Sequence, residues 1–370
     1  MTKPRRILGV TGTRAEFGLL TPVFQAIAAR GELQLLVAVS GAHLIGPTCT
    51  RNEVAAMFPI AAEIPMQVGG ETGRIADALA FARGVHGCAL TIDALRPDVV
   101  LVLGDRIEAF AAASAAAIAG VRVAHLHGGD RAEGIADDAM RHAISKLAHV
   151  HFAASPSSAE RLLRMGEDAA RIQLVGSPAI DGLEQMPPLS DAEYLALGRP
   201  DIVLALHPTG RTDAEEEAGA TMLIDTCRAK GRTLVLDPNS DPGRDGIMRA
   251  IDKSDLARAA HFKRPQWIGL LRRIRLLVGN SSAGLIEAAA LRVRTLNVGS
   301  RQSGRERASN VVDCGEFEAS AIQQGIDHAW TMADPDGLHP FGLGRTGEMC
   351  AEFLASPVAD RLTVTKRNSY

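Results

Sequence analysis

The sequence predicts two doubly wound α/β domains, and three observations support this fold class. Short apolar runs typical of buried strands alternate with longer helical patterns along the chain. A polar stretch at 181–201, which contains Pro187 and Pro188, interrupts this alternation once. The same alternation then starts again. We therefore expect one domain over residues 1–182, a loosely packed connection, and a second domain over 200–344. A C-terminal helix within 345–370 is expected to pack back on the first domain.

The individual elements follow from the positions of these apolar runs. The predicted strands are 6–11, 33–39, 98–104, 121–126 and 149–154 in the first domain, and 202–206, 232–237, 274–280 and 293–299 in the second. Helices are predicted between them, for example over 75–95 and 107–120. In sheets of this kind ligands bind at the carboxyl ends of the strands. Two domains facing each other would place that site in the cleft between them.

Composition excludes several classes of protein. The net charge is −3 and aromatic residues make up only 4% of the chain, so neither a basic field nor a base-stacking surface favours nucleic acid. The five cysteines are scattered without a C-x-x-C pair, which disfavours a zinc site or a disulfide framework. The N-terminal apolar run is too short for a signal peptide, and no run of about 18 apolar residues predicts a membrane span. We expect a cytoplasmic protein.

Two predicted strand ends in the first domain carry polar residues. GTRAEFG (12–18) follows the first strand and supplies Arg14 at the start of a helix, where it is either a surface arginine or an anion ligand. LGDRIE (103–108) places Asp105 directly after a strand. This position is common for a helix N-cap, so Asp105 is either a cap or a reactive carboxylate.

The second domain has a similar pair of stretches. NSSAGLIE (280–287) delivers Ser281 and Ser282 to the start of a helix, where hydroxyls and free backbone N–H groups bind anions. A serine N-cap is the alternative. Glu287, further along, is placed to bind a ribose diol, and Arg301 in RQSGR (301–305) favours a phosphate. LHPTG (206–210) puts His207 at a strand end, although a lone histidine is often structural.

A cluster of acids follows the strand 121–126, in AHLHGGDRAEGIADDAMRHAISK (124–146). Its acids include Asp130, Asp137 and Asp138, and Asp105 is expected nearby. Such carboxylates could bind Mg²⁺ with phosphates. The interleaved Arg131 and Arg141 favour a different interpretation, in which the carboxylates orient hydroxyls and move protons. We therefore predict no metal.

Taken together, these motifs resemble the UDP-N-acetylglucosamine 2-epimerase family, and most closely its hydrolysing branch of the sialic-acid pathway. The resemblance runs from about residue 6 to residue 310 and rests on GTRAEFG, SGAH (40–43), LGDR, H-x-x-GGD with ADDAMRHAISKLAH, LHP, PNSDPG (238–243), GNSSAGLIEA and GSRQSGRE (299–306). It implies the GT-B fold, with the active site between two Rossmann-like domains, and the conversion of UDP-GlcNAc to UDP and free N-acetylmannosamine. Related members act on 2,4-diacetamido-trideoxyhexose nucleotides in legionaminic acid synthesis. The resemblance implies no cofactor, no membrane or nucleic-acid partner, and a homodimer or homotetramer.

The resemblance also assigns roles to residues of this chain. The implied catalytic residues are Asp105, Asp137 or Asp138 with Arg141, and His207 from the second domain. Asp130, from the acid cluster, is a further catalytic candidate beside His127. The implied substrate-binding residues are Arg14, Ser281, Ser282 and Arg301 at the phosphates, Glu287 at the ribose, His43 near the sugar, and Asn239 in PNSDPG.

One position departs from the family pattern. His127 stands where the family usually has a glutamate proposed as a catalytic acid/base. We predict that His127 moves protons in its place, since an imidazole titrates near neutrality. The alternative is that it only hydrogen-bonds the sugar and reports a different substrate. UDP-GlcNAc is the first choice of substrate, and a UDP- or GDP-linked diacetamido sugar is the second. A glycosyltransferase on the same fold and a silent nucleotide-sugar-binding protein are the rival functions.

Overall fold

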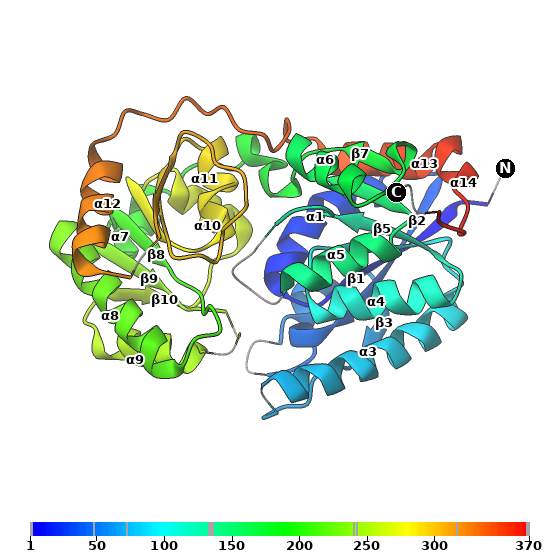
Figure 1. Ribbon diagram of the computed structural model, residues 1–370, viewed down its shortest axis with the longest axis horizontal. Helices are drawn as coiled ribbons and strands as arrows, with labels where there is room; N and C mark the ends of the chain where they lie inside the picture. The colour runs from blue at the N-terminus through cyan, green and yellow to red at the C-terminus, as the bar shows by residue number, and fades with distance from the viewer. Residues whose placement is uncertain are drawn as a thin grey trace. The chain divides into compact units, whose positions relative to one another are not determined.

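The computed structural model describes residues 3–46, 49–71, 73–131, 137–239, 241, 243–315 and 317–367. Its contacts divide the chain into two compact units (Figure 1). Unit 1 comprises Met1–Asp130, Ala136–Asp181 and Phe341–Tyr370, and unit 2 comprises Arg131–Ile135 and Gly182–Pro340. The chain therefore leaves unit 1 after Asp181 and re-enters it at Phe341.

Unit 1 is built on a seven-stranded parallel sheet with the order β3-β2-β1-β4-β5-β6-β7. Its strands are β1 (Arg5–Thr11), β2 (Leu33–Ser40), β3 (Ile60–Ile64), β4 (Val99–Leu103), β5 (Arg122–Leu126), β6 (Val150–Ala153) and β7 (Ile172–Leu174). Its helices are α1 (Arg14–Ala28), α2 (Arg51–Ala55), α3 (Arg74–Leu95), α4 (Ile107–Ile118), α5 (Asp137–Leu147), α6 (Pro156–Arg164), α13 (Thr346–Ala355) and α14 (Pro357–Arg361). The strand order reverses between β1 and β4, which is the position where doubly wound sheets bind ligands.

Both faces of this sheet are covered, because successive residues of the buried strands point to opposite sides. Ile7 and Leu101 join a core cluster with α1 and α13. Leu8 and Val100 join a second cluster with α3, α4 and α5. Figure 1 shows these last three helices side by side over one face of the sheet.

Unit 2 has a six-stranded parallel sheet with the order β10-β9-β8-β11-β12-β13, which reverses between β8 and β11. The strands are β8 (Ile202–Ala205), β9 (Thr233–Leu236), β10 (Ala257–Ala259), β11 (Leu276–Gly279), β12 (Arg294–Val298) and β13 (Val311–Cys314). The helices are α7 (Asp191–Ala196), α8 (Asp213–Lys230), α9 (Arg244–Lys253), α10 (Arg264–Leu271), α11 (Glu287–Ala290) and α12 (Ala319–Thr331). Helices α8, α9 and α12 pack on one face, where Leu204 and Val278 lie at the centre of the core.

The structure contains all nine predicted strands, and it adds four that the sequence analysis missed. The added strands are β3, β7, β10 and β13, which are the four outermost strands of the two sheets. Each is short and carries partly exposed residues. An edge strand pairs on one side only, so it lacks the continuous apolar run by which a central parallel strand is recognised.

The stretch 181–201 is not a loose connection, which corrects the prediction. It contains the helix α7, whose N-terminus forms a capping box between Ser190 and Glu193. Tyr194 on this helix is buried, its hydroxyl donates a hydrogen bond of 2.7 Å to the carbonyl of Pro200, and Arg273 lies over its ring. The segment therefore packs on unit 2.

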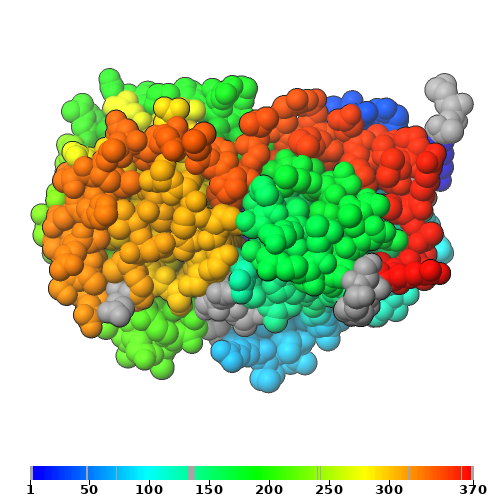
Figure 2. Space-filling model, turned by 45° about the horizontal axis from the view of Figure 1, so that its top comes forward, coloured from blue at the N-terminus to red at the C-terminus, as the bar shows by residue number. Residues whose placement is uncertain are grey.

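The C-terminal segment lies on unit 1. Cys350 and Leu354 of α13 belong to the core cluster that contains α1. The residues that follow α14 are held through their backbone carbonyls, since Arg122 Nε donates to Leu362 at 2.8 Å and a ring nitrogen of His149 lies 2.9 Å from the Val364 carbonyl. Figure 2 shows this segment in red on the surface of unit 1, next to the green region that contains α6 and β7.

Helix α3 is the one helix of the described chain that is long and apolar enough to cross a membrane by length and composition. No such run was predicted from the sequence. In the structure α3 contacts α4 and β3, so it covers one face of the unit 1 sheet. We interpret it as a helix of this layer.

Candidate active site

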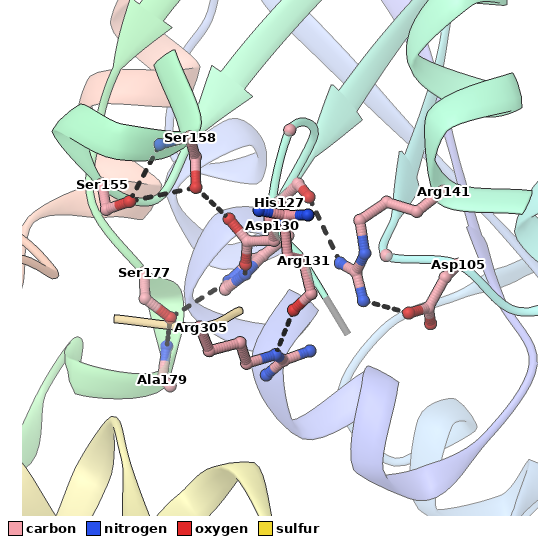
Figure 3. Close-up of polar contacts among 12 residues, drawn as sticks. Asp105, His127, Asp130, Arg131, Arg141, Ser155, Ser158, Ser177, Ala179 and Arg305 are labelled. Atoms are coloured by element: carbon pink, nitrogen blue, oxygen red, sulfur yellow. Dashed lines mark hydrogen bonds and ion pairs between the residues drawn. The ribbon is translucent and has the colours of Figure 1, made fainter. Parts of the chain in front are cut away.

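Arg141 contacts two other predicted catalytic positions in unit 1. It lies on α5 with a side chain that is 4% exposed. One guanidinium nitrogen donates to the carboxylate of Asp105, and the other terminal nitrogen donates to the backbone carbonyl of His127 at 3.2 Å (Figure 3). The carboxylate of Asp105 is paired with this arginine and does not cap a helix, because the N-cap residue of α4 is Arg106, without a side-chain cap. The helix-cap interpretation of Asp105 is therefore wrong.

The backbone that presents Asp105 is braced by His125. One ring nitrogen of His125 lies 2.7 Å from the carbonyl of Gly104, and the other lies 3.2 Å from the hydroxyl of Ser145. The ring is fully buried, and this desolvation lowers the pKa of His125 to about 3. A neutral imidazole is thus held between β4 and α5, where it fixes the residue that precedes Asp105.

His127 and Asp130 form a buried pair at the end of β5. Nδ1 of His127 lies 2.7 Å from one carboxylate oxygen of Asp130, and Nε2 lies 3.1 Å from the hydroxyl of Ser177. The other Asp130 oxygen accepts a hydrogen bond of 2.6 Å from Ser158. Both ring nitrogens of His127 are therefore engaged by the protein in this conformation.

The backbone of this loop requires unusual conformations. His127 has a φ of +59°, in the left-handed region that residues with a side chain rarely occupy. Gly129 has a φ of +78°, and a Cβ atom there would lie 2.4 Å from the carbonyl oxygen of Ser158. The loop thus approaches the first turn of α6 closely, and this approach brings Asp130 to Ser158.

The remaining acids of the cluster are less defined. The side chain of Asp137, the first residue of α5, lies outside the described part of the structure. Asp138 lies 3.5 Å from a ring nitrogen of His142, one helical turn away. Within the described ranges, no group of three or more His, Cys, Asp or Glu side chains is arranged to hold a metal ion.

Arg14 and His43 lie at the ends of β1 and β2, and both have partners within unit 1. Arg14 forms a two-point ion pair with Glu53, with distances of 2.8 and 3.2 Å. His43 is fully buried between the hydroxyls of Thr11 and Thr50, at 3.1 and 2.6 Å. This burial lowers the pKa of His43 to about 4, so its ring is neutral. An anion that binds Arg14 would have to compete with the carboxylate of Glu53. A sugar that contacts the His43 ring would have to replace the hydrogen bond to Thr50.

Two buried glutamates near these residues were quoted within motifs but not singled out. Glu16 accepts a hydrogen bond of 2.7 Å from the N–H of Gly12, and burial raises the pKa of Glu16 to about 8. Glu108 is 1% exposed and accepts a hydrogen bond of 2.8 Å from Gln67. A Cβ atom at Gly41 would lie 2.4 Å from a carboxylate oxygen of Glu108, so this glycine makes room for the acid.

In unit 2, His207 follows β8 and is held by two asparagines. Asn280, after β11, accepts from the backbone N–H of His207 at 2.7 Å and donates to its carbonyl at 2.8 Å. The backbone N–H of Asn239 donates to Nδ1 of His207 at 3.2 Å. Desolvation, helped by the charge of Arg301, lowers the pKa of His207 to about 3. The ring is therefore neutral with its hydrogen on Nε2, so His207 offers an N–H donor rather than a base.

The segment after Asn280 differs from the single helix that was predicted. It contains a short 3₁₀ turn, Ser282–Gly284, followed by the four-residue helix α11, which begins at Glu287. The hydroxyl of Ser281 caps the turn by accepting from the N–H of Ala283 at 3.4 Å. Because the helix macrodipole arises from aligned peptides along a helix, two single turns carry less of it than the predicted helix. Any anion affinity must come mainly from hydroxyl and N–H donors.

Arg301 and Gln302 follow β12 and approach Asn280. Arg301 donates to the Asn280 carbonyl at 3.4 Å, and the buried amide of Gln302 donates to the same oxygen at 2.8 Å. Arg301 was predicted from the sequence, whereas Gln302 was not. Unit 2 thus gathers His207, Asn280 and Arg301 at the carboxyl ends of β8, β11 and β12, beside its strand-order reversal.

Comparisons with known proteins identify the family and the fold. A model of the UDP-N-acetylglucosamine 2-epimerase family matches residues 25–355. The chain is 36% identical to UDP-N,N'-diacetylbacillosamine 2-epimerase (hydrolyzing) of Legionella pneumophila, over 99% of this chain and 100% of that protein. It is 29% identical to UDP-N-acetylglucosamine 2-epimerase of Neisseria meningitidis serogroup B, over 98% of each. The structure of UDP-GlcNAc 2-epimerase from Methanocaldococcus jannaschii, in complex with UDP-GlcNAc and UDP, matches 94% of this chain and 99% of that chain with a TM-score of 0.80 and 16% identity. The GT-B-like fold class predicted from the sequence is confirmed.

Proposed function

We propose that this chain, which belongs to the UDP-N-acetylglucosamine 2-epimerase family, releases the nucleotide from an N-acetylated nucleotide sugar and inverts C2 of the freed sugar. The observation that carries this proposal is the buried group in unit 1 in which Arg141 contacts both Asp105 and the backbone of His127. In this proposal Asp105 is the base, His127 the acid and Arg141 a fixed cation, close to the reversal point of the unit 1 sheet. Such ionisable groups are what proton transfer at a sugar carbon requires.

The proposed reaction has two steps, elimination of the nucleotide and addition of water. In the first, the bond between C1 and the phosphate oxygen breaks, a base takes the proton from C2, and a 2-acetamidoglycal and the nucleoside diphosphate form. In the second, water adds across the glycal double bond: its hydroxyl bonds to C1, an acid gives a proton to C2 from the opposite face, and the proton released by water restores that acid. Asp105 is our candidate for the base, because its carboxylate is partly exposed and paired with Arg141. His127, backed by Asp130, is our candidate for the second proton transfer.

The second unit supports the departure of the nucleotide. His207, Ser281, Ser282 and Arg301 supply N–H, hydroxyl and guanidinium donors, and Glu287 is the candidate for the ribose. A well-placed donor to developing negative charge contributes roughly 2.7–4 kcal/mol in comparable sites. The neutral His207 fits this role, because its Nε2–H can donate to a phosphate oxygen.

For the sugar we propose UDP-N,N'-diacetylbacillosamine, a 2,4-diacetamido sugar of nonulosonic acid synthesis, in preference to the first choice made from sequence. The support is the relative with this substrate in its name, which is 36% identical over its whole length. UDP-GlcNAc remains the second candidate, because the relative named for it is 29% identical over a similar length. His127, which departs from the family pattern, is consistent with a substrate other than UDP-GlcNAc.

A substrate panel tests this function. We would incubate the protein with UDP-N,N'-diacetylbacillosamine, UDP-GlcNAc and their GDP counterparts, and follow nucleotide release and sugar configuration by NMR. The expected result is free sugar with inverted C2, ¹⁸O from labelled water at C1, and deuterium from D₂O at C2. Label at C1 without deuterium at C2 would indicate simple hydrolysis. A nucleotide-bound epimer as the sole product, turnover only with an added acceptor, or binding without turnover would each overturn the proposal.

A further inference from the structure

Ser177 contacts His127, the proposed proton-transfer group. It lies in the last segment of unit 1 before the chain passes to unit 2, and its side chain is fully buried. Its backbone N–H donates to the carbonyl of Phe341 at 2.9 Å, where the chain re-enters unit 1. Its hydroxyl lies 3.1 Å from Nε2 of His127 (Figure 3). The serine is thus held at its backbone while its side chain reaches the imidazole.

The surrounding hydrogen bonds determine which way the hydroxyl points. The oxygen of Ser177 accepts the N–H of Ala179 at 3.2 Å, so its single hydrogen is free to donate to Nε2 of His127. On the other side of the ring, Nδ1 faces Asp130, which can only accept when it is ionised. Asp130 is itself held by the hydroxyl of Ser158. All these groups are satisfied together when neutral His127 carries its hydrogen on Nδ1.

We propose that Ser177 is a positioning residue that, together with Asp130, fixes His127 in the tautomer protonated on Nδ1 and so keeps Nε2 as the proton-accepting nitrogen. This inference rests on the proposed role of His127 in proton transfer. When Nε2 gains a proton, the second lone pair of the Ser177 oxygen accepts it as a hydrogen bond, so the serine supports both charge states. A tautomer fixed by a neighbouring group is a general requirement for a histidine that exchanges protons.

The order Asp130–His127–Ser177 is also that of a hydrolase triad, in which the serine attacks the substrate. Two observations argue against that role here. The Ser177 side chain has no exposed surface, and its oxygen already accepts the N–H of Ala179. The positioning role requires neither exposure nor a free lone pair in the neutral state.

The test compares Ser177→Ala with Ser177→Thr, which retains a hydroxyl. We expect Ser177→Ala to lower kcat by about 10- to 100-fold, to leave KM within about 3-fold, and to change the pH profile of kcat. Ser177→Thr should restore most of the rate and the profile. Ser190→Ala is the matched control, because it removes another serine cap, that of α7, without contacting His127. It should leave both the rate and the profile unchanged.

A second measurement does not depend on turnover. In ¹⁵N-histidine-labelled protein, the His127 resonances, assigned by their loss in His127→Asn, should show a hydrogen on Nδ1 and an unprotonated Nε2. In Ser177→Ala the Nε2 shift should move. If no substrate of the panel is turned over but the tautomer shifts as stated, the proposed function fails and the positioning stands.

Three outcomes would overturn the positioning role. Equal kcat, pH profile and ¹⁵N shifts in Ser177→Ala and the parent would leave Ser177 as a cap only. Equal losses in Ser177→Ala and Ser177→Thr would indicate a packing effect. Covalent labelling of Ser177 by a serine-directed fluorophosphonate, detected by mass spectrometry, would make it a nucleophile.

Discussion

The two units place different chemistry at equivalent positions of the same kind of sheet. In unit 1 the carboxyl ends of β4 and β5 carry mutually paired ionisable groups, with Arg141 bound to Asp105 and His127 bound to Asp130. In unit 2 the reversal point carries mainly neutral donors, among them Asn280 and a histidine whose pKa is far below neutrality. Paired ionisable groups suit acid–base steps, whereas fixed donors suit a ligand that is already negative. The difference supports our proposal that proton chemistry belongs to unit 1 and nucleotide binding to unit 2.

Asp105→Asn should have the largest effect on kcat, so it tests this assignment most directly. The amide keeps an oxygen for Arg141 but cannot accept a proton at neutral pH. We expect kcat to fall toward the upper end of about 10²–10⁴-fold, while UDP affinity stays within a few fold by calorimetry. Asp98→Asn is the matched control, because Asp98 lies at the other end of β4 and accepts only the N–H of Arg6 at 2.7 Å. Near-normal turnover of Asp105→Asn would show that Asp105 is not the base.

His127→Asn should have the next largest effect. Asparagine tolerates the left-handed backbone that His127 adopts, so the loop is retained while the imidazole is lost. We expect kcat to fall toward the lower end of about 10²–10⁴-fold, because the proposed proton-transfer group is absent. UDP affinity, measured in parallel, should not change. A fully active variant would leave His127 as a specificity residue.

The strands and helix α7 show which elements can be predicted from the sequence alone. The central strands were predictable because their apolar runs are continuous, and the edge strands β3, β7, β10 and β13 were missed because half-exposed strands lack that pattern. Helix α7 did carry a signal, since Ser190 and Glu193 have the spacing of a capping box. Pro187 and Pro188, which precede this helix, favoured a loose connection instead.

The candidate site was predictable where a residue directly follows a strand, as Asp105 and His127 do. It was not predictable where a contact depends on distant segments. Ser177 reaches His127 from 50 positions along the chain, and nothing in the local sequence GSPAID indicates this. Similarly, the pairing of Arg14 with Glu53 depends on how α2 packs beside the end of β1.

Arg301→Ala and Ser282→Ala test whether unit 2 binds the nucleotide. Each removes a donor to a charged oxygen, so each should weaken UDP binding by about 1.5–3 kcal/mol, which is roughly a 10- to 150-fold increase in Kd. Arg258→Ala is the control, because Arg258 forms its ion pairs with Asp237 and Asp252 at an edge of the same sheet. Unchanged UDP affinity in both variants would show that Arg301 and Ser282 do not bind the nucleotide.

The smallest expected effect concerns stability and contrasts a buried acid of each unit. Glu216 in unit 2 is buried with a cation, since Arg211 lies 3.1 Å from its carboxylate. Glu16 in unit 1 is held mainly by the N–H of Gly12, and desolvation raises its pKa to about 8 from 4.5. Between these two pH values the folded protein keeps a proton that the unfolded chain has lost. The free energy of unfolding therefore falls as pH rises through this window.

Glu16→Gln cannot ionise and should remove this part of the pH dependence. Its Tm and that of the parent should agree near pH 4.5 and then separate by a few degrees by about pH 9, with the variant more stable. Glu216→Gln should instead lower the Tm near neutral and alkaline pH, because it leaves Arg211 without the charge of its partner. Thermal unfolding across pH measures both. Parallel curves for Glu16→Gln and the parent would show that Glu16 titrates alike in the folded and unfolded chain, and the contrast between the buried acids of the two units would then be lost.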